Sequence, residues 1–264
     1  MEYSMKFSLK TLFVAAALTI TIGTANAKPN GLDQIKRNGA LTVGVKDDVP
    51  GFGYMNPATK QYEGLEIDLA KAIAKKIFGN ENKIKYVPVT AKNRGAFLNQ
   101  DRIDMVIATF TVTDERKQNF DFSDIYYTDS VGIMVKKASG ITSFKNLENK
   151  KVGITQGAMT ATTIKNAAIK EGVFLNIINY PSNRTLKDAL DNGEIDAFCI
   201  DKSILHGYLD SSVTILPEHY DEMMYGIAIK KDNTPVTKLV NEVIRDLIKS
   251  GQLDKLLIKH KLNF

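Results

Sequence analysis

The stretch IDMVIATFTVTDER, Ile103–Arg116, decides the fold that we expect for this chain. Its first half, Ile103–Ala108, is apolar apart from Asp104 and rich in β-branched residues, which predicts a buried parallel strand. Its second half turns polar at once. Ligands of open α/β sheets bind beyond the carboxyl ends of the strands, and this polar half falls at that position. The stretch therefore predicts an α/β fold with a ligand site at the rim of a sheet.

The polar half has the residue types of a ligand site. Arg116 offers a planar fork of donors that matches a carboxylate. Thr113, three residues earlier, suits the N-cap of a short helix, and Thr109 and Thr111 supply further hydroxyls. Any one of these residues alone is more typical of an ordinary polar loop. The hydroxyls together with the arginine favour a ligand site.

The first 27 residues predict a signal peptide. Lys6 and Lys10 form a positive region, Leu12–Ile22 is an apolar run, and Ala25-Asn26-Ala27 is a small-residue cleavage site. A transmembrane anchor is the alternative, but the apolar run is shorter than the roughly 20 residues that a bilayer requires. We therefore expect export to the periplasm, with the cell surface as a second location, and a mature chain that begins at Lys28.

Composition and charge exclude several classes of protein. The mature chain keeps 237 residues (264 − 27), enough for one large domain or two lobes with cores. Losing two lysines and one glutamate changes its formal charge from +5 to +4. It has no basic stripe with interleaved aromatic residues, so we expect no nucleic-acid partner. The single cysteine, Cys199, lies in an apolar run and should be buried without a disulfide. The three histidines are scattered, so we expect no metal and no cofactor.

The order of segments in the first half of the chain recurs in the second half. The matching pairs are 41–45 with 151–155, 67–78 with 160–171, 84–87 with 177–180, 94–99 with 186–192, 103–108 with 195–200, and 131–137 with 225–231. Such an ordered repeat predicts two β-α-β-α-β lobes of similar plan.

The last pair of segments, 131–137 and 225–231, shares the pattern Gly-Ile-x-Val/Ile-Lys-Lys and predicts two hinge crossings. The chain would leave the first lobe near Met134 and return near Ile227. Lobe 1 would then comprise residues 28–133 and 228–264, and lobe 2 residues 134–227. The apolar periodicity of Val236–Lys261 predicts helix that packs back on lobe 1, and the two crossings allow a cleft that closes.

Several motifs in the mature chain are together specific for one family: Gly64–Ala70, Ala108–Arg116, Phe122–Tyr127, Val152–Gly157, Ile195–Ala197 and Asp201. They resemble the periplasmic solute-binding proteins, family 3, that supply polar amino acids to ABC transporters. Val45–Pro50, Ala91–Gly95 and Ala197–Leu205 are most similar to the aspartate- and glutamate-binding members, one of which is also a surface adhesin. The resemblance implies a two-lobed periplasmic-binding-protein fold (type II), an ABC permease as partner, and a monomer.

The resemblance also implies how an amino acid binds. Arg116 would bind its α-carboxylate, helped by the hydroxyl of Thr111. From the other lobe, Thr160 opens a helix whose N-terminus suits the same anion. The family usually has a second hydroxyl at the position of Met159, so one donor is missing here.

The remaining expected contacts concern the ammonium group and the side chain of the ligand. Asp201 and the Thr109 carbonyl would bind the ammonium. Lys46 and Arg94 follow strands at their carboxyl side, and although such residues are usually solvated, the resemblance favours contact with an acidic side chain, aspartate or glutamate. Phe52 would cover the ligand's methylenes, or else be a plain core aromatic.

Two alternatives stay open for the function. One is a binding protein for another polar amino acid, such as glutamine or cystine. The other is an enzyme on the same fold that resembles cyclohexadienyl dehydratase. An enzyme of that kind needs a general acid, whereas the expected site engages Asp201 with an ammonium group and contains no histidine. We therefore expect a binding protein and no catalytic residues.

Overall fold

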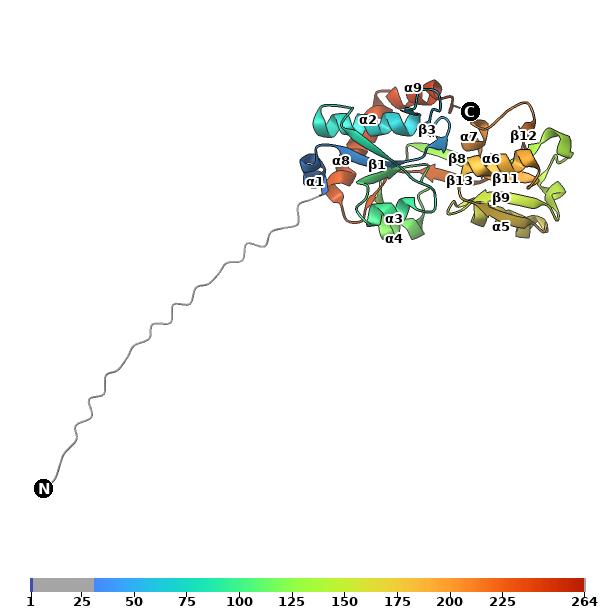
Figure 1. Cartoon of the computed structure of the whole chain (residues 1–264), viewed down its shortest axis with the longest axis horizontal. Helices are drawn as coiled ribbons and strands as arrows, with labels where there is room; N and C mark the ends of the chain where they lie inside the picture. The colour runs from blue at the N-terminus through green and yellow to red at the C-terminus, as the bar shows by residue number, and fades with distance from the viewer. Residues whose placement is uncertain (2–30, 264) are drawn as a thin grey trace.

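The computed structural model describes residues 1 and 31–263, and residues 31–263 form two α/β lobes that lie side by side (Figure 1). Apart from Met1, the expected signal peptide at residues 1–27 lies outside the described residues. Among the helices that the structure describes, none combines the length and the apolar character needed to cross a membrane. The two-lobed α/β fold expected from the sequence is confirmed.

The first lobe is built on a five-stranded sheet in the order β5-β1-β6-β14-β7. Its strands are β1 (Leu41–Val45), β5 (Ile84–Pro88), β6 (Met105–Ile107), β7 (Phe120–Phe122) and β14 (Ala228–Lys230). A small second sheet joins β2 (Asp48–Val49), β3 (Gly53–Met55) and β4 (Tyr62–Glu63). The helices are α1 (Gly31–Asn38), α2 (Leu65–Phe78), α3 (Arg94–Asn99), α4 (Asp114–Asn119), α8 (Thr234–Lys249) and α9 (Gln252–Lys259). In Figure 1, α2 and α9 lie above the large sheet, and α3 and α4 lie below it.

The second lobe is built on a sheet in the order β10-β9-β11-β8-β12, with β13 also paired to β8. Its strands are β8 (Tyr127–Lys136), β9 (Lys151–Thr155), β10 (Asn176–Tyr180), β11 (Ala197–Asp201), β12 (Val213–Ile215) and β13 (Tyr220–Tyr225). Its helices are α5 (Thr160–Glu171), α6 (Asn183–Asn192) and α7 (Lys202–His206), with short 3-10 helices η1 (Lys137–Ser139) and η2 (Phe144–Leu147). In Figure 1, α6 and α7 lie above the sheet and α5 below it. Cys199, on β11, is buried and free, as expected.

The repeat seen in the sequence appears as equivalent strands in the two sheets. β1 lies between β5 and β6, just as β9 lies between β10 and β11, and all these pairings are parallel. The next strand of each sheet is antiparallel and comes from the other half of the repeat: β14 pairs with β6, and β8 pairs with β11. Each lobe therefore contains one strand that belongs to the other half of the repeat, and we call β8 and β14 the exchanged strands.

This exchange corrects the position of the first hinge crossing. β8 starts at Tyr127 and pairs with β11, β12 and β13, so the crossing near Met134 that the sequence suggested lies too late in the chain. The physical reason is burial, because residues 131–135 of β8 are buried in the core of the second lobe. We propose residues 31–126 with 226–263 as lobe 1 and residues 127–225 as lobe 2.

The C-terminal helices pack on lobe 1, as the sequence predicted. The buried face of α8 includes Val236, Val240 and Ile244, and the helix packs against α2. At the end of α9, Lys259 Nζ and His260 Nε2 both lie 2.7 Å from a carboxylate oxygen of Asp68 on α2. The end of the chain is thereby attached to the first lobe, as the red and cyan helices of Figure 1 show.

Candidate ligand-binding site

A narrow cavity of about 20 Å³ lies between the two lobes. It is lined by Lys46, Ala91, Arg94, Thr109, Thr111, Thr155, Ala158, Met159, Asn183, Ile200, Asp201 and Ile204. Lys46 follows β1, Thr109 lies beyond β6, and Thr155 and Asp201 end β9 and β11, so the carboxyl ends of both sheets face the cavity. Five residues expected from the sequence meet here: Lys46, Arg94, Thr109, Thr111 and Asp201.

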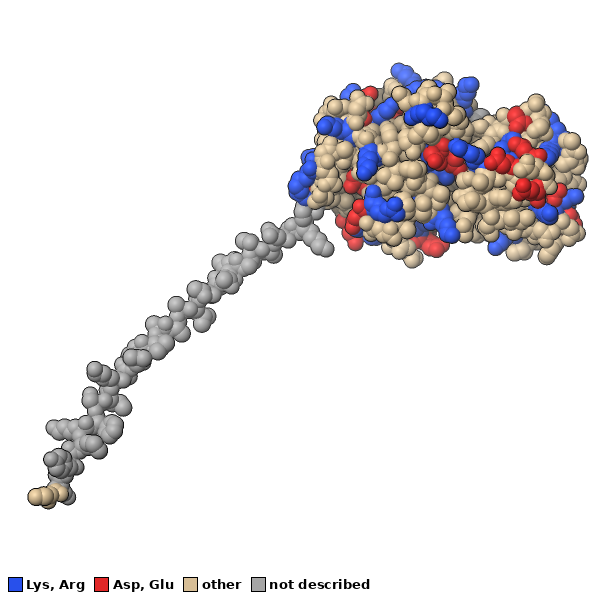
Figure 2. Space-filling model, in the orientation of Figure 1, with Lys and Arg blue, Asp and Glu red and all other residues tan. Residues whose placement is uncertain are grey.

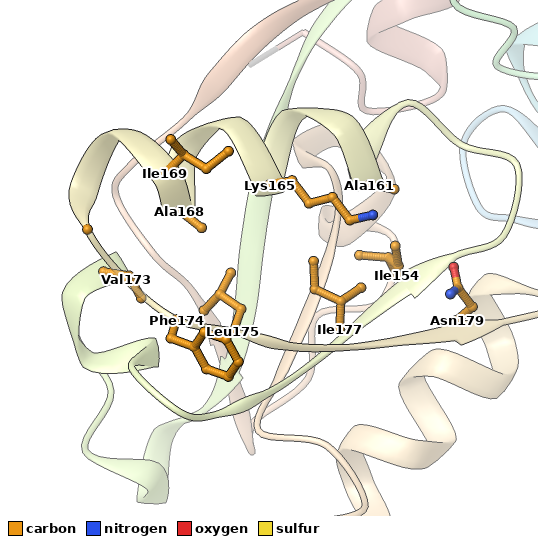
Figure 3. A pocket seen from close by; sticks show the side chains of 11 residues that line it. Ile154, Ala161, Lys165, Ala168, Ile169, Val173, Phe174, Leu175, Ile177 and Asn179 are labelled. Carbon is orange, nitrogen blue, oxygen red and sulfur yellow. The ribbon is translucent and has the colours of Figure 1, made fainter.

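A larger hollow on lobe 2 has the wrong chemistry for an amino acid. This groove of about 690 Å³ lies between α5 and β10 and is lined mainly by apolar side chains, as Figure 3 shows. Among the described residues that line it, only Lys165 is charged. A zwitterion needs partners of both signs, so the smaller cavity between the lobes is the candidate site.

Arg94, the first residue of α3, is a buried cation in the cavity wall. Its Nη1 donates to the carbonyls of Ala108 and Thr109, and its guanidinium carbon lies 4.0 Å from the centre of the Phe110 ring. Among the described residues, its Nε has no hydrogen-bond partner. Burial, and then the like charge of Arg116, lower the pKa of Arg94 to about 9. A nearby anion would relieve this unfavourable burial of charge.

Thr109 is held in an unusual backbone conformation. Its φ is +45°, which is uncommon for a β-branched residue and is kept by its surroundings. Its N–H donates to Glu66 Oε1 at 2.5 Å, and the hydroxyl of Tyr126 donates to the same oxygen at 2.5 Å. Burial raises the pKa of the Glu66 carboxyl. Glu66 thus holds the backbone N–H of Thr109, while Arg94 donates to its carbonyl.

Lys46 is paired with a carboxylate that sequence reasoning missed. Its Nζ lies 3.0 Å from Asp48 Oδ1, and both side chains are almost fully buried. The other carboxylate oxygen of Asp48 accepts the backbone N–H of Asn183 in lobe 2 at 2.9 Å. The position of Asp48 just after β1 is the signal that could have revealed it. Asn183 likewise opens α6 shortly after the end of β10 at Tyr180, and its side chain accepts from the Thr155 hydroxyl at 2.6 Å.

Asp201 lies on the lobe 2 side of the cavity. One of its carboxylate oxygens accepts a hydrogen bond from the hydroxyl of Tyr225, the last residue of β13. Burial, and then the negative charge of Asp129, raise the pKa of Asp201 to about 7. A cationic group of a ligand would therefore meet a carboxylate that needs a counter-charge.

Arg116 lies at the edge of the cavity rather than in its wall. Thr113 caps its helix, as predicted, by accepting the N–H of Arg116 at 3.2 Å. Its Nη1 donates to the Thr111 carbonyl at 2.7 Å, and its Nη2 reaches the Gly157 carbonyl of lobe 2 at 3.3 Å. Burial lowers the pKa of Arg116 to about 10. Its fork thus already spans the two lobes.

Two further expected site residues, besides Arg116, lie outside the cavity wall. Phe52 is fully buried and packs edge-on against Tyr127 and Tyr225, so it is a core aromatic, the alternative that the sequence left open. Thr160 begins α5, as expected, but it is fully buried and does not line the cavity. Among the described residues, its hydroxyl has no hydrogen-bond partner.

The lobes touch on both flanks of the cavity. On one flank Gly157, with φ +86°, comes so close that an added Cβ would lie 2.8 Å from backbone atoms of Ala91. On the other flank, the Tyr208 hydroxyl donates to the Asp48 carbonyl, and Gly207 approaches Pro50. The structure therefore shows the lobes closed over the site, and entry of an amino acid requires them to separate, because 20 Å³ holds little more than one water.

Two lobes joined at a hinge and closed over a small, charged cavity define a solute-binding protein. The chain belongs to the bacterial extracellular solute-binding proteins, family 3, whose family model matches residues 41–263.

Among its relatives is the ABC transporter glutamine-binding protein of Bacillus subtilis, 36% identical over 236 residues, which are 88% of this chain and 85% of the relative. A glutamine-binding protein of Geobacillus stearothermophilus is 39% identical over 210 residues, 78% of this chain and 79% of the relative. The fold is also similar to the crystal structure of a cysteine-binding protein from Campylobacter jejuni. That match has a TM-score of 0.80 at 29% identity and covers 88% of this chain and 92% of the other.

Proposed function

We propose that this solute-binding protein captures an amino acid in the periplasm and delivers it to an ABC permease. The distribution of charge in the cavity supports this proposal. Asp201 in lobe 2 is suited to the ammonium group, and Arg116 in lobe 1 is suited to the α-carboxylate. The relatives described above are named for amino acids, and one of them is named as part of an ABC transporter.

We further propose that the amino acid is acidic, glutamate or aspartate. The observation that carries this proposal is the pair of cations, Lys46 and Arg94, that line the cavity at 2% and 3% exposure. The charge of Arg116 also lowers the pKa of Arg94, so an amino acid with two carboxylates would offset more of the positive charge here than one with a single carboxylate.

Glutamine is the second candidate. Two relatives carry glutamine in their names, and the ion pair between Lys46 and Asp48 leaves less net charge for an acidic side chain. Glutamate and glutamine are nearly the same shape, so the balance of charge around Lys46 and Arg94 decides between them.

Isothermal titration of the mature chain, residues 28–264, tests these proposals. Glutamate, aspartate, glutamine, asparagine, cystine and arginine form the panel, and we expect the acids to bind at least tenfold more tightly than their amides. Tighter binding of glutamine than of both acids would reject the acidic proposal but keep the amino-acid carrier. Arg116→Ala should lower the affinity for every amino acid, because truncating one partner of a buried charge pair costs ~2–5 kcal/mol of binding free energy. Turnover of a prephenate-like substrate would instead point to an enzyme.

A further inference from the structure

Asp48 makes contacts with residues of both lobes. Its carboxylate has two partners on opposite sides of the cleft: Lys46 Nζ in lobe 1 at 3.0 Å and the Asn183 N–H in lobe 2 at 2.9 Å. Its backbone carbonyl has a third partner, the hydroxyl of Tyr208 in lobe 2. Asp48 is 3% exposed, so water screens none of these contacts effectively.

We propose that Asp48 is a specificity-determining residue: held against Lys46 by the Asn183 amide of the closed lobe 2, its carboxylate offsets the charge that Lys46 presents to the ligand's side chain. This inference rests on the proposed amino-acid site. In it, the preference for a carboxylate over an amide side chain depends on how firmly the Asn183 N–H keeps the Asp48 carboxylate beside Lys46.

The geometry of α6 supports a fixed position for this carboxylate. Asn183 is the first residue of α6, so its N–H has no acceptor within the helix. The positive end of the ten-residue helix is directed at Asp48. When the lobes separate, Asp48 loses the Asn183 and Tyr208 contacts together, and only its partner within lobe 1, Lys46, remains.

Asp48→Asn tests the charge directly. The ratio of glutamate to glutamine affinity should rise about tenfold, because Lys46 loses its counter-charge while the side chain keeps its shape. Asp47→Asn is the matched control, one residue earlier, and should leave the ratio within about threefold of wild type. An unchanged ratio in a folded Asp48→Asn variant overturns the proposal. Thermal unfolding of each variant establishes that it is folded.

A second pair of variants, one without the cross-lobe N–H and one that keeps it, tests this contact without changing any charge. Asn183→Pro deletes the N–H that holds Asp48, and proline is well tolerated at the first residue of a helix after an extended residue such as Ser182. Asn183→Ala deletes the same side chain but keeps the N–H. We expect the glutamate-to-glutamine ratio to be severalfold higher in Asn183→Pro than in Asn183→Ala. Equal ratios overturn the role of closure even where Asp48→Asn does not fold.

Tyr208→Phe separates affinity from specificity. It removes the bond to the Asp48 carbonyl and leaves the carboxylate in place, so both affinities should fall severalfold while their ratio stays constant. If Tyr208→Phe changes the glutamate-to-glutamine ratio as much as Asp48→Asn does, closure alone explains the change in specificity. The proposal that Asp48 offsets the charge of Lys46 is then rejected. A wild-type chain that binds no amino acid at all would reject the proposed function itself, which is a different outcome from an unchanged ratio.

Discussion

Substituting Gly157 should keep the two lobes from closing. Gly157 has φ +86°, and an alanine Cβ there would lie 2.8 Å from Ala91 and Lys92 backbone atoms in the opposite lobe. Ordinary contacts start at 3.4 Å, so the lobes must part by about 0.6 Å at this point (3.4 − 2.8). The Arg116 fork would also move away from the Gly157 carbonyl that it now reaches.

Two costs of Gly157→Ala are separable. The left-handed backbone costs ~1–2 kcal/mol in unfolding free energy for any alanine. Gly172→Ala, at the end of α5, is the matched control, because it has φ +66° and its Cβ meets nothing within 4 Å. Incomplete closure additionally weakens a charge-assisted contact from lobe 2, such as that of Asp201, which is worth ~1.5–3 kcal/mol, or roughly ten- to a hundredfold in affinity.

Thermal unfolding measures the backbone cost. Titration with the amino acid that binds most tightly, together with small-angle X-ray scattering, measures the loss of closure. Both variants should unfold at lower temperature than wild type, whereas only Gly157→Ala should lose affinity and fail to become as compact with ligand. If Gly157→Ala binds and compacts as wild type does, the contact between this loop and Ala91 does not limit closure, and the reasoning is wrong.

Three further predictions follow from the cavity and the core. Arg94→Met should lower the affinity for glutamate roughly ten- to a hundredfold in the titration panel and reduce the ratio of glutamate to glutamine affinity. An unchanged ratio would show that Arg94 does not face the ligand's side chain. Because the pKa of Asp201 is raised to about 7 and only its ionised form pairs with an ammonium group, affinity should fall roughly tenfold from pH 8 to pH 6. Asp201→Asn should flatten that profile, and a flat wild-type profile would contradict the assignment. Phe52→Leu should lower the free energy of unfolding by about 1 kcal/mol in denaturant titration without changing affinity, since Phe52 packs in the core; a lost affinity would return Phe52 to the site.

Much of the fold could be predicted from local patterns in the sequence. β6 and the Thr113 cap follow from the apolar run at 103–108 and the hydroxyl three residues before Arg116. The repeat correctly predicted two similar lobes. It could not assign β8 and β14 to their sheets, because exchanged strands have the same apolar pattern in either lobe and only long-range pairing decides between them.

The candidate site was predicted where residue type and strand end agreed, as for Lys46 and Asp201. Sequence reasoning missed Asp48 and Glu66, since an acidic residue near a loop or in the first turn of a helix is usually exposed, and their burial depends on contacts with distant residues. Phe52 illustrates the reverse case, because an aromatic residue beside a predicted cleft is equally suited to a core, and its packing with Tyr127 and Tyr225 favours the core.

The exchanged strands determine the order in which the lobes can be completed as the chain is made. β14 lies between β6 and β7, so β7 has no neighbouring strand in the sheet of lobe 1 until residues 228–230 have been synthesised. All the strands of lobe 2 lie between residues 127 and 225 and are available earlier. Lobe 1, which contains the earlier strands, is therefore the last to be finished. A chain that stops after residue 227 would have all the strands of the lobe 2 sheet, but its lobe 1 sheet would lack the strand that joins β7 to β6.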